Sequence, residues 1–411
     1  ELPLDSTVIA LSLESGETGE ASVTVEVTEP RKWSGEDPYL YTLVLEEESA
    51  QGTVYESCQL GFRKITYKQN DSGWWAGTAT DHDLIRINGQ PVTLHGVDRH
   101  ETHPEYGYAL TREVMLEDIT IMLENNINAV RTSHYPNSPY WYYLCDKYGI
   151  YVMDEANLEC HSNMIFENQL ITENMSRSVI DREYNMVCRD RNHPSVIIWS
   201  LGNECKNPDI LRTILVEPYE TPWSETEVLH AFDPTRPWHY EQATDMYETG
   251  IDMKSGMYLS VEEMIEHGES DVPQPHIQCE LQHAMGNSMG NFDEYWQVID
   301  TYRNLQGCFI WDFIDQAITL TADDGTEYFA YGVDFGERVN DGNFCCNGLL
   351  LPDRTVQPEM AEVRYQYQML KFSDADVQNG LVEMKNFFLF TDSSQKYEFD
   401  WSLMRDDEVL Q

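Results

Sequence analysis

The spacing of apolar and polar residues divides the chain into three parts. In residues 1–62 apolar and polar side chains alternate, as in 21–28 and 39–45, and turn residues separate these runs. A period of two is typical of strands that bury one face. We therefore predict that residues 1–62 are the C-terminal part of a β-sandwich domain.

In residues 63–370 short apolar runs alternate with amphipathic runs that are long enough for helices. This alternation implies a parallel sheet, and eight repeats of this size favour a (β/α)8 TIM barrel over an open sheet. We expect strands at 92–97, 129–132, 150–153, 196–201, 238–241, 256–259, 277–280 and 308–311, and helices that include 112–125, 140–148, 261–267 and 292–303.

The last part, residues 371–411, again has strand-like runs at 381–386 and 397–401. These runs are too few for a complete sandwich, so we expect the start of a second sandwich domain and a chain that is cut at both ends. The predicted fold class is therefore α/β: a (β/α)8 TIM barrel flanked by partial β-sandwich (immunoglobulin-like) domains.

The charge of the chain limits its partners. A net charge of -46 comes from 72 acidic against 26 basic residues, which disfavours nucleic acid and anionic membranes as partners. A solvated acidic surface explains most of this charge, and a neutral sugar is a compatible ligand. No apolar run reaches membrane-spanning length.

The cysteines predict a cytoplasmic protein with reduced thiols. Nine cysteines occur at irregular spacing without a CxxC pair. The adjacent Cys345 and Cys346 are not expected to bridge each other. Such usage is typical of a reducing compartment.

Two predicted strands end on a carboxylate. The run 196–201 leads into Asn203 and Glu204, and the run 277–280 ends on Glu280. TIM barrels place their active sites at the C-terminal ends of the strands. Glycoside hydrolysis needs one carboxyl group to protonate the leaving oxygen and a second to attack or to activate water. Structural acids at a barrel rim are the alternative, although an amide beside Glu204 favours a site that holds a sugar hydroxyl.

Other strand ends carry further candidates. Glu159 and His161 lie two residues apart after the third strand, an oxygen-rich pair with one histidine that suits Mg²⁺ or Mn²⁺. A hydrogen-bonded loop is the alternative that spacing alone favours. His134 and Trp311 follow the second and eighth strands, where each either contacts a sugar or packs in the core. His100 follows the first strand in a run of histidines and acids, which indicates either a metal site or, more often, a polar rim with one or two substrate contacts.

Six segments of the barrel occur in an order that resembles the large bacterial β-galactosidases of glycoside hydrolase family 2. They are 94–104 (LHGVDRHETHP), 128–136 (NAVRTSHYP), 189–204 (RDRNHPSVIIWSLGNE), 279–288 (CELQHAMGNS), 306–316 (QGCFIWDFIDQ) and 340–348 (NDGNFCCNG). The resemblance covers the whole predicted barrel, 63–370.

This resemblance implies hydrolysis of terminal non-reducing β-D-galactosides, such as lactose, by a retaining double displacement. Glu204 would be the acid/base and Glu280 the nucleophile. The implied Mg²⁺ ligands are Glu159, His161 and Glu204, the implied Na⁺ ligands are the carbonyl of Phe344 and Asn347, and the full-length protein would be a homo-oligomer. The implied contacts to galactose are His100, His134, Asn203, Tyr258, His283, Trp311 and Asn347.

The sequence also departs from the family pattern. Glu204 is followed by Cys-Lys-Asn instead of the usual Ser-Gly, next to the leaving group, and Leu281-Gln282 replaces Tyr-Ala after the nucleophile. In this family an N-terminal jelly-roll domain supplies an Asp to the sugar and Na⁺ site. We expect this domain to be absent from the chain and the Na⁺ site to be incomplete.

Two alternatives stay open. The chain could be another family 2 glycosidase, a β-mannosidase or a β-glucuronidase. A glucuronidase should have a basic pocket for the sugar acid, and this chain is short of Lys and Arg. It could also be a truncated, non-catalytic sugar-binding fragment.

Overall fold

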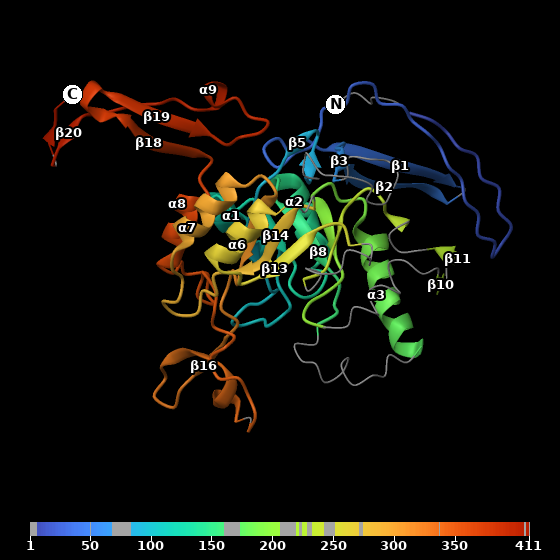
Figure 1. The fold of residues 1–411 in the computed structure, drawn as a ribbon. Coiled ribbons are helices and arrows are strands. Elements are labelled where there is room, and N and C mark those ends of the chain that lie inside the picture. The colour runs from blue at the N-terminus through green and yellow to red at the C-terminus, as the bar shows by residue number, and fades with distance from the viewer. Residues whose placement is uncertain are drawn as a thin grey trace.

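The centre of the molecule is a sheet of eight parallel strands (Figure 1). The computed structural model describes residues 6–49, 51–67, 84–159, 173–205, 219–221, 224–227, 232–241, 251–270, 274–336, 338–406 and 408–410. The eight strands are β6 (Leu94–Asp98), β7 (Ala129–Arg131), β8 (Tyr151–Glu155), β9 (Val196–Ser200), β12 (Trp238–His239), β13 (Lys254–Met257), β14 (His276–Leu281) and β15 (Leu305–Ile310).

The sheet is nearly closed into a barrel. Neighbouring strands follow chain order, and β15 pairs in parallel with β6, so the last strand returns to the first. Between β12 and β13 the N–H of Asp252 donates to the carbonyl of Trp238 at 3.0 Å. The predicted (β/α)8 TIM barrel is therefore confirmed, and each predicted barrel strand overlaps an observed one.

Helices cover the outside of the barrel. They are α1 (Arg112–Glu124), α2 (Pro139–Tyr148), α3 (Glu173–Asp190), α6 (Val261–Glu269), α7 (Phe292–Thr301) and α8 (Glu359–Gln366). Local sequence sets where they begin: Thr111 caps α1, and Ser260 with Glu263 forms a capping box on α6. Their apolar faces pack on outward strand residues such as Val130 and Val152 in one continuous core.

A second apolar cluster fills the barrel near the N-terminal ends of its strands. It contains Trp33 and inward residues of the strands such as Phe309. A Cβ on Gly96 would lie 2.4 Å from Cδ1 of Phe309, so glycine on β6 leaves the space that this ring occupies. The small sheet of β3 (Ile65–Thr66), β4 (Arg86–Ile87) and β5 (Gln90–Pro91) contributes to the same cluster. The apolar filling leaves only the opposite, C-terminal end of the barrel for polar chemistry.

Hairpins project from the barrel (Figure 1). They are β1 (Tyr41–Ser49) with β2 (Gly52–Leu60), β10 (Tyr219–Thr221) with β11 (Ser224–Glu227), β16 (Ile318–Thr321) with β17 (Glu327–Ala330), β18 (Leu370–Asp376) with β19 (Leu381–Asn386), and β20 (Met404–Arg405) with β21 (Glu408–Val409). Short helical segments are η2 (Gly332–Phe335), η3 (Val377–Asn379) and α9 (Ser393–Lys396).

Two predicted strands are wrong. Residues 21–28 and 397–401 form no strand, and most of their side chains are exposed. Their alternating sequence is compatible with a strand, but a strand is stable only beside a partner, and within the described residues neither segment has a ladder partner. The predicted domain limits at 62 and 370 stay predictions.

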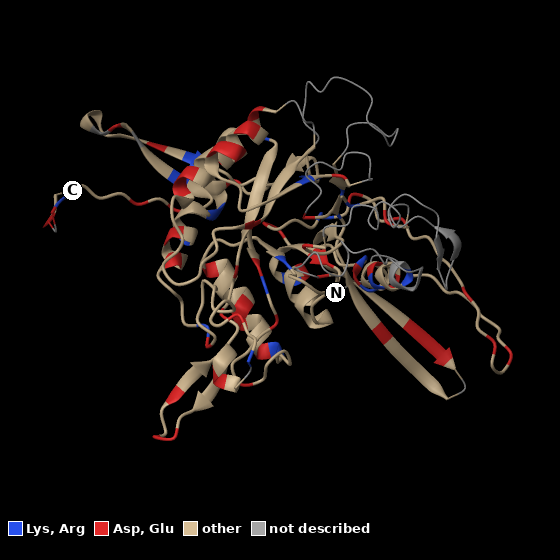
Figure 2. Ribbon diagram, turned by 60° about the horizontal axis from the view of Figure 1, so that its bottom comes forward, with Lys and Arg blue, Asp and Glu red and all other residues tan. Residues whose placement is uncertain are grey.

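The surface is predominantly acidic. Figure 2 shows many Asp and Glu residues on the peripheral helices, loops and hairpins, and few Lys and Arg. Among the described residues no helix is both long and apolar enough to cross a membrane.

Three buried histidines predict how stability depends on pH. Burial lowers the pKa values of His95, His239 and His276 to about 3, from an ordinary value of 6.5. As the pH falls below 6.5, the unfolded chain binds protons that the folded chain does not. The free energy of unfolding should therefore decrease from pH 7 to pH 5. Urea titrations at several pH values measure this slope.

The variant His95→Phe isolates one of these groups, because the His95 ring already stacks on Tyr367 at 4.8 Å and an aromatic ring fits there. We expect a smaller decrease in stability between pH 7 and pH 5 than in the parent chain. An unchanged slope would show that His95 is protonated equally in both states.

Candidate active site

Polar residues occupy the last inward positions of three neighbouring strands. Alternate residues of a strand point to the same side. On β7 and β8 the inward residues Ala129 and Met153 belong to the apolar cluster inside the barrel, and Arg131 and Glu155 follow two residues later. Asp98 ends β6 beside them. The C-terminal end of the barrel is therefore lined with charge.

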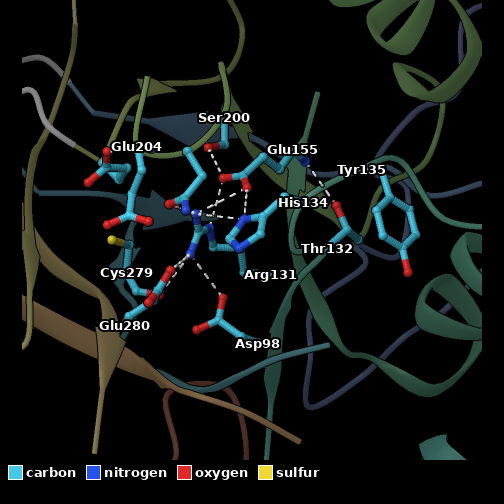
Figure 3. Close-up of polar contacts among 12 residues, drawn as sticks. Asp98, Arg131, Thr132, His134, Tyr135, Glu155, Ser200, Glu204, Cys279 and Glu280 are labelled. Carbon is cyan, nitrogen blue, oxygen red and sulfur yellow. Dashed lines mark hydrogen bonds and ion pairs between the residues drawn. The ribbon is translucent and has the colours of Figure 1, made fainter. Parts of the chain in front are cut away.

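Arg131 is the centre of this polar cluster (Figure 3). Its guanidinium is fully buried and donates to both oxygens of Glu155 at 2.8 and 3.0 Å. It also donates to Asp98 Oδ1 at 3.1 Å, to Glu280 Oε1 at 3.2 Å and to Asn203 Oδ1 at 2.8 Å. One side chain thus joins residues of four strands and the loop after β9.

Glu155 is the carboxylate that pairs with Arg131 through both of its oxygens. Burial opposes ionisation of this carboxyl, but Arg131 and His134 outweigh it and hold the pKa of Glu155 below its ordinary value. Ser200 Oγ donates to Glu155 at 2.6 Å, and His134 Nδ1 lies 2.7 Å from it. Burial lowers the pKa of His134 to about 4. At neutral pH we therefore assign an anionic Glu155 and a neutral His134.

Glu280 is held through both oxygens. It is 5% exposed on β14 and accepts from Arg131 on Oε1, while Tyr258 Oη donates to Oε2 at 2.9 Å. Burial raises the pKa of Glu280 and the charge of Glu204 adds to this, whereas Arg131 and Tyr258 oppose it. The carboxylate is thus oriented on both sides.

Glu204 lies near Glu280 (Figure 3). Its charge acts on Glu280, and Figure 3 shows the two side chains on the same side of Arg131. Glu204 follows β9, and its φ of 43° is in the left-handed region, which is uncommon for a residue other than glycine. Its backbone N–H donates to Glu241 Oε1 at 2.6 Å. Glu241, which follows β12, therefore helps to hold the backbone that presents Glu204.

The predicted sugar contacts form two groups at this end of the barrel. In the first, the rings of His134 and Trp311 stack at 5.2 Å, and His100 meets Trp311 edge-on at 5.3 Å. His100 Nδ1 also lies 3.5 Å from the buried carboxylate of Asp312, to which Gln316 donates.

The second group surrounds His283. Its ring lies 6.2 Å from that of Tyr258 and 5.2 Å from that of Phe344, and its Nε2 is 3.4 Å from Asn347 Nδ2. Since Tyr258 bonds Glu280 and His134 bonds Glu155, both groups join the Arg131 cluster.

Two family models match this chain, one over the barrel and one over the N-terminal segment. Residues 79–372 match the model described as glycosyl hydrolases family 2, TIM barrel domain, and residues 5–63 match a model described as glycosyl hydrolases family 2. The chain belongs to glycosyl hydrolase family 2.

Similar proteins agree with this family assignment. The chain is 41% identical over 404 residues to a β-galactosidase of Priestia megaterium, covering 95% of this chain and 36% of that protein. It is 39% identical over 408 residues to a β-galactosidase of Vibrio vulnificus, covering 94% and 37%. The chain therefore spans little more than a third of the length of these relatives.

Solved structures of the same fold include a β-D-glucuronidase of Dictyoglomus thermophilum, with a TM-score of 0.64 and 20% identity over 83% of this chain and 59% of that chain. A family 2 β-galacturonidase of Eisenbergiella tayi has a TM-score of 0.62 and 22% identity over 84% and 61%. At this identity the likeness shows the fold alone.

The ligands expected for Mg²⁺ in this family 2 chain are only partly described. Glu159 forms a parallel bridge with Asn203, which places it beside the backbone of Glu204. Two carboxylates fit the oxygen ligands that Mg²⁺ prefers. The predicted third ligand, His161, lies outside the described residues. Within the described residues no cluster of three or more His, Cys, Asp or Glu could hold a metal.

The expected Na⁺ ligands lie side by side. Asn347 Nδ2 donates to the carbonyl of Phe344 at 2.8 Å. Asn347 Oδ1 is buried and has no hydrogen-bond partner among the described residues. A buried oxygen without a donor beside a carbonyl group fits a small hard cation.

The residues that orient the two carboxylates were not among the predicted site residues; they are Arg131, Glu155, Asp98 and Glu241. For the first two a signal existed, because a charged residue two positions after an inward apolar residue must also point into the barrel. For Glu241 no local signal existed, since its partner Glu204 is 37 residues away.

Proposed function

We propose that this family 2 chain hydrolyses terminal β-D-galactosides with retention, with Glu204 as acid/base and Glu280 as nucleophile. The observation that carries the proposal is the orientation of Glu280 by Arg131 and Tyr258, with Glu204 near enough for its charge to act on Glu280. The names of the sequence relatives support galactose as the sugar.

The mechanism has two displacements. Glu204 donates a proton to the glycosidic oxygen while Glu280 attacks the anomeric carbon, so the alcohol leaves and a galactosyl ester of Glu280 forms. Glu204 then removes a proton from water, which attacks the same carbon and releases Glu280 as a carboxylate. Hydrogen bonds from Arg131 and Tyr258 stabilise that carboxylate, and therefore help Glu280 to leave in the second step.

Residues of this site would bind two cations, Mg²⁺ and Na⁺. Glu159, His161 and Glu204 would hold Mg²⁺, and Asn347 with the carbonyl of Phe344 would hold Na⁺. A bound Mg²⁺ supplies positive charge that favours the ionised form of Glu204. Asn203 and His134, held by Arg131, would bind sugar hydroxyls, and Trp311 would stack on the sugar ring.

A uronic acid is a weaker candidate for the sugar. A sugar carboxylate requires a cation that is available to it. Arg131, which reaches this pocket, is already bonded to Glu155, Asp98 and Glu280. The glucuronidase structures share the fold at 20% identity, and this does not identify a sugar.

A fluorosugar tests the proposal. Incubation with an activated 2-deoxy-2-fluoro-galactoside should add one sugar to the chain, and peptide mass spectrometry should find it on Glu280. The same peptide should stay unlabelled with the corresponding glucuronide. Label on another residue would overturn the nucleophile assignment, and label from the glucuronide alone would overturn the sugar.

The contact between Glu241 and Glu204 gives a separate prediction. Glu241→Leu removes the acceptor of the partly buried Glu204 N–H, and losing such a hydrogen-bond partner costs about 1–3 kcal/mol. If this cost falls on the placement of Glu204, kcat should decrease by roughly ten- to a hundredfold with little change in KM. Steady-state kinetics measure the two constants.

Glu241→Gln is the matched control, because its amide oxygen can still accept that hydrogen bond. Burial raises the pKa of Glu241 to about 8, so the neutral amide also resembles the protonated acid. We expect kcat close to that of the parent chain. Equal losses in both variants would show that the carboxyl group itself, not its hydrogen bond, is required.

A further inference from the structure

Two adjacent cysteines lie at the edge of the candidate active site. Cys345 and Cys346 are both free and partly exposed. They follow Phe344 and precede Asn347, the two residues assigned to the Na⁺ site. No step of the proposed mechanism uses either thiol.

The two thiols are close enough to interact directly. Their side chains form a hydrogen bond with each other within one turn of the chain. The turn therefore presents two adjacent free thiols to a single ligand that can bind both sulfurs.

The turn that carries the pair is bonded to the site. The carbonyl of Cys345 accepts the N–H of Gln316 at 2.8 Å, and the side chain of Gln316 donates to Asp312, next to His100. On the other side, the N–H of Cys346 donates to Asn343 at 2.9 Å. The turn that carries both sulfurs is therefore connected by hydrogen bonds to Asp312, and it contains the Phe344–Asn347 pair.

We propose that Cys345 and Cys346 form a two-thiol binding site for trivalent arsenicals. An aryl arsonous acid carries two hydroxyl groups on arsenic, and each is replaced by one cysteine sulfur. Two As–S bonds form, two As–O bonds break, and the hydroxyl groups leave as two water molecules with the two thiol protons. Arsenic stays trivalent, so no oxidant or reductant is needed.

The other described cysteines do not offer such a pair. Cys58 is exposed and Cys188 is partly exposed, but they are far apart in sequence, and Cys145, Cys205, Cys279 and Cys308 are buried. Soft thiolate ligands prefer soft, thiophilic elements. Attachment through two sulfurs makes the second bond intramolecular, which raises affinity by about a hundredfold or more over one thiol.

Titration of the full chain with phenylarsine oxide tests the site. Intact-protein mass spectrometry should show one phenylarsenic group in place of the two thiol hydrogens, with the oxygen of phenylarsine oxide lost as one water molecule. A dithiol should reverse this binding, and the same concentration of a monothiol should not. Cys345→Ser and Cys346→Ser should each weaken binding by about a hundredfold. Cys58→Ser is the matched control and should leave binding unchanged. Equal affinity in the parent chain and both serine variants would overturn the proposal.

A second measurement rests on the proposed function. If the chain cleaves galactosides, bound phenylarsenic should raise KM, because Asn347 in the same turn is proposed to contact the sugar, and Cys346→Ser should be resistant. The mass measurement is independent of turnover. If phenylarsenic binds but the chain cleaves no galactoside, the proposed function is contradicted and the thiol site is supported. If the chain cleaves galactosides but does not bind phenylarsenic, the thiol site is contradicted and the proposed function is supported.

Discussion

Glu204→Ala should lose most of its activity toward β-galactosides with poor leaving groups and recover with azide. Removing a general acid lowers kcat by about 10²–10⁴-fold. With an activated aryl galactoside the first displacement needs little proton donation, so the galactosyl ester should accumulate. Azide can attack the galactosyl ester of Glu280 without help from a general base. It should therefore free Glu280 and form β-galactosyl azide. Product analysis by NMR gives both the rate and the configuration.

The control for this variant is Glu105→Ala, which removes an exposed carboxylate from the loop after β6. It should keep the parent activity and show no response to azide. Azide rescue of a Glu280→Ala variant to an α-galactosyl azide is also expected, because azide would then attack from the face that Glu280 vacates. β-Azide from Glu280→Ala would reverse the two assignments.

Arg131→Met should destabilise the fold and abolish turnover together. The change removes the cation that Asp98, Glu155 and Glu280 share in the barrel, and the buried carboxylates then lack their counter-charge. Breaking a buried ion pair by removing one partner costs about 3–5 kcal/mol. Denaturant unfolding should show this decrease in the free energy of unfolding. The decrease should be smaller at low pH, because protonated carboxyl groups carry no charge that needs a counter-charge.

Arg131→Lys separates charge from geometry. A lysine restores a positive charge but cannot donate to four acceptors in fixed directions. It should recover part of the stability while kcat stays low, because Glu280 and Asn203 lose their orientation. Arg31→Met is the matched control, since Arg31 pairs with Asp37 at the surface, and little effect is expected. Parent-like kcat in Arg131→Lys would contradict the positioning role.

Local pattern predicted the barrel better than the flanking segments. Each barrel strand is apolar because both of its faces are buried, and this leaves a signal in the sequence itself. The same reasoning failed for 21–28 and 397–401. Alternation there is compatible with a strand, but pairing is a tertiary property, and the described structure has no partner strand beside them.

Side chains at strand ends could also be placed from sequence, and their partners could not. Glu204 and Glu280 were predicted because parallel strands bring their C-terminal ends to one rim. The bonds that orient Glu280 come from Arg131 on β7 and from Tyr258 after β13. No spacing along the chain encodes those contacts, because Arg131 lies 149 residues from Glu280.

The sequence by itself determined the eight-strand α/β barrel, the two strand-end carboxylates and the family resemblance, since each depends on short runs of neighbouring residues. Only the tertiary structure decided that Arg131 holds Glu280 and Asn203, that Glu241 holds the backbone of Glu204, and that Cys345 is joined through Gln316 to Asp312. The physical reason is that barrel closure sets which distant side chains meet, and burial then sets their charge.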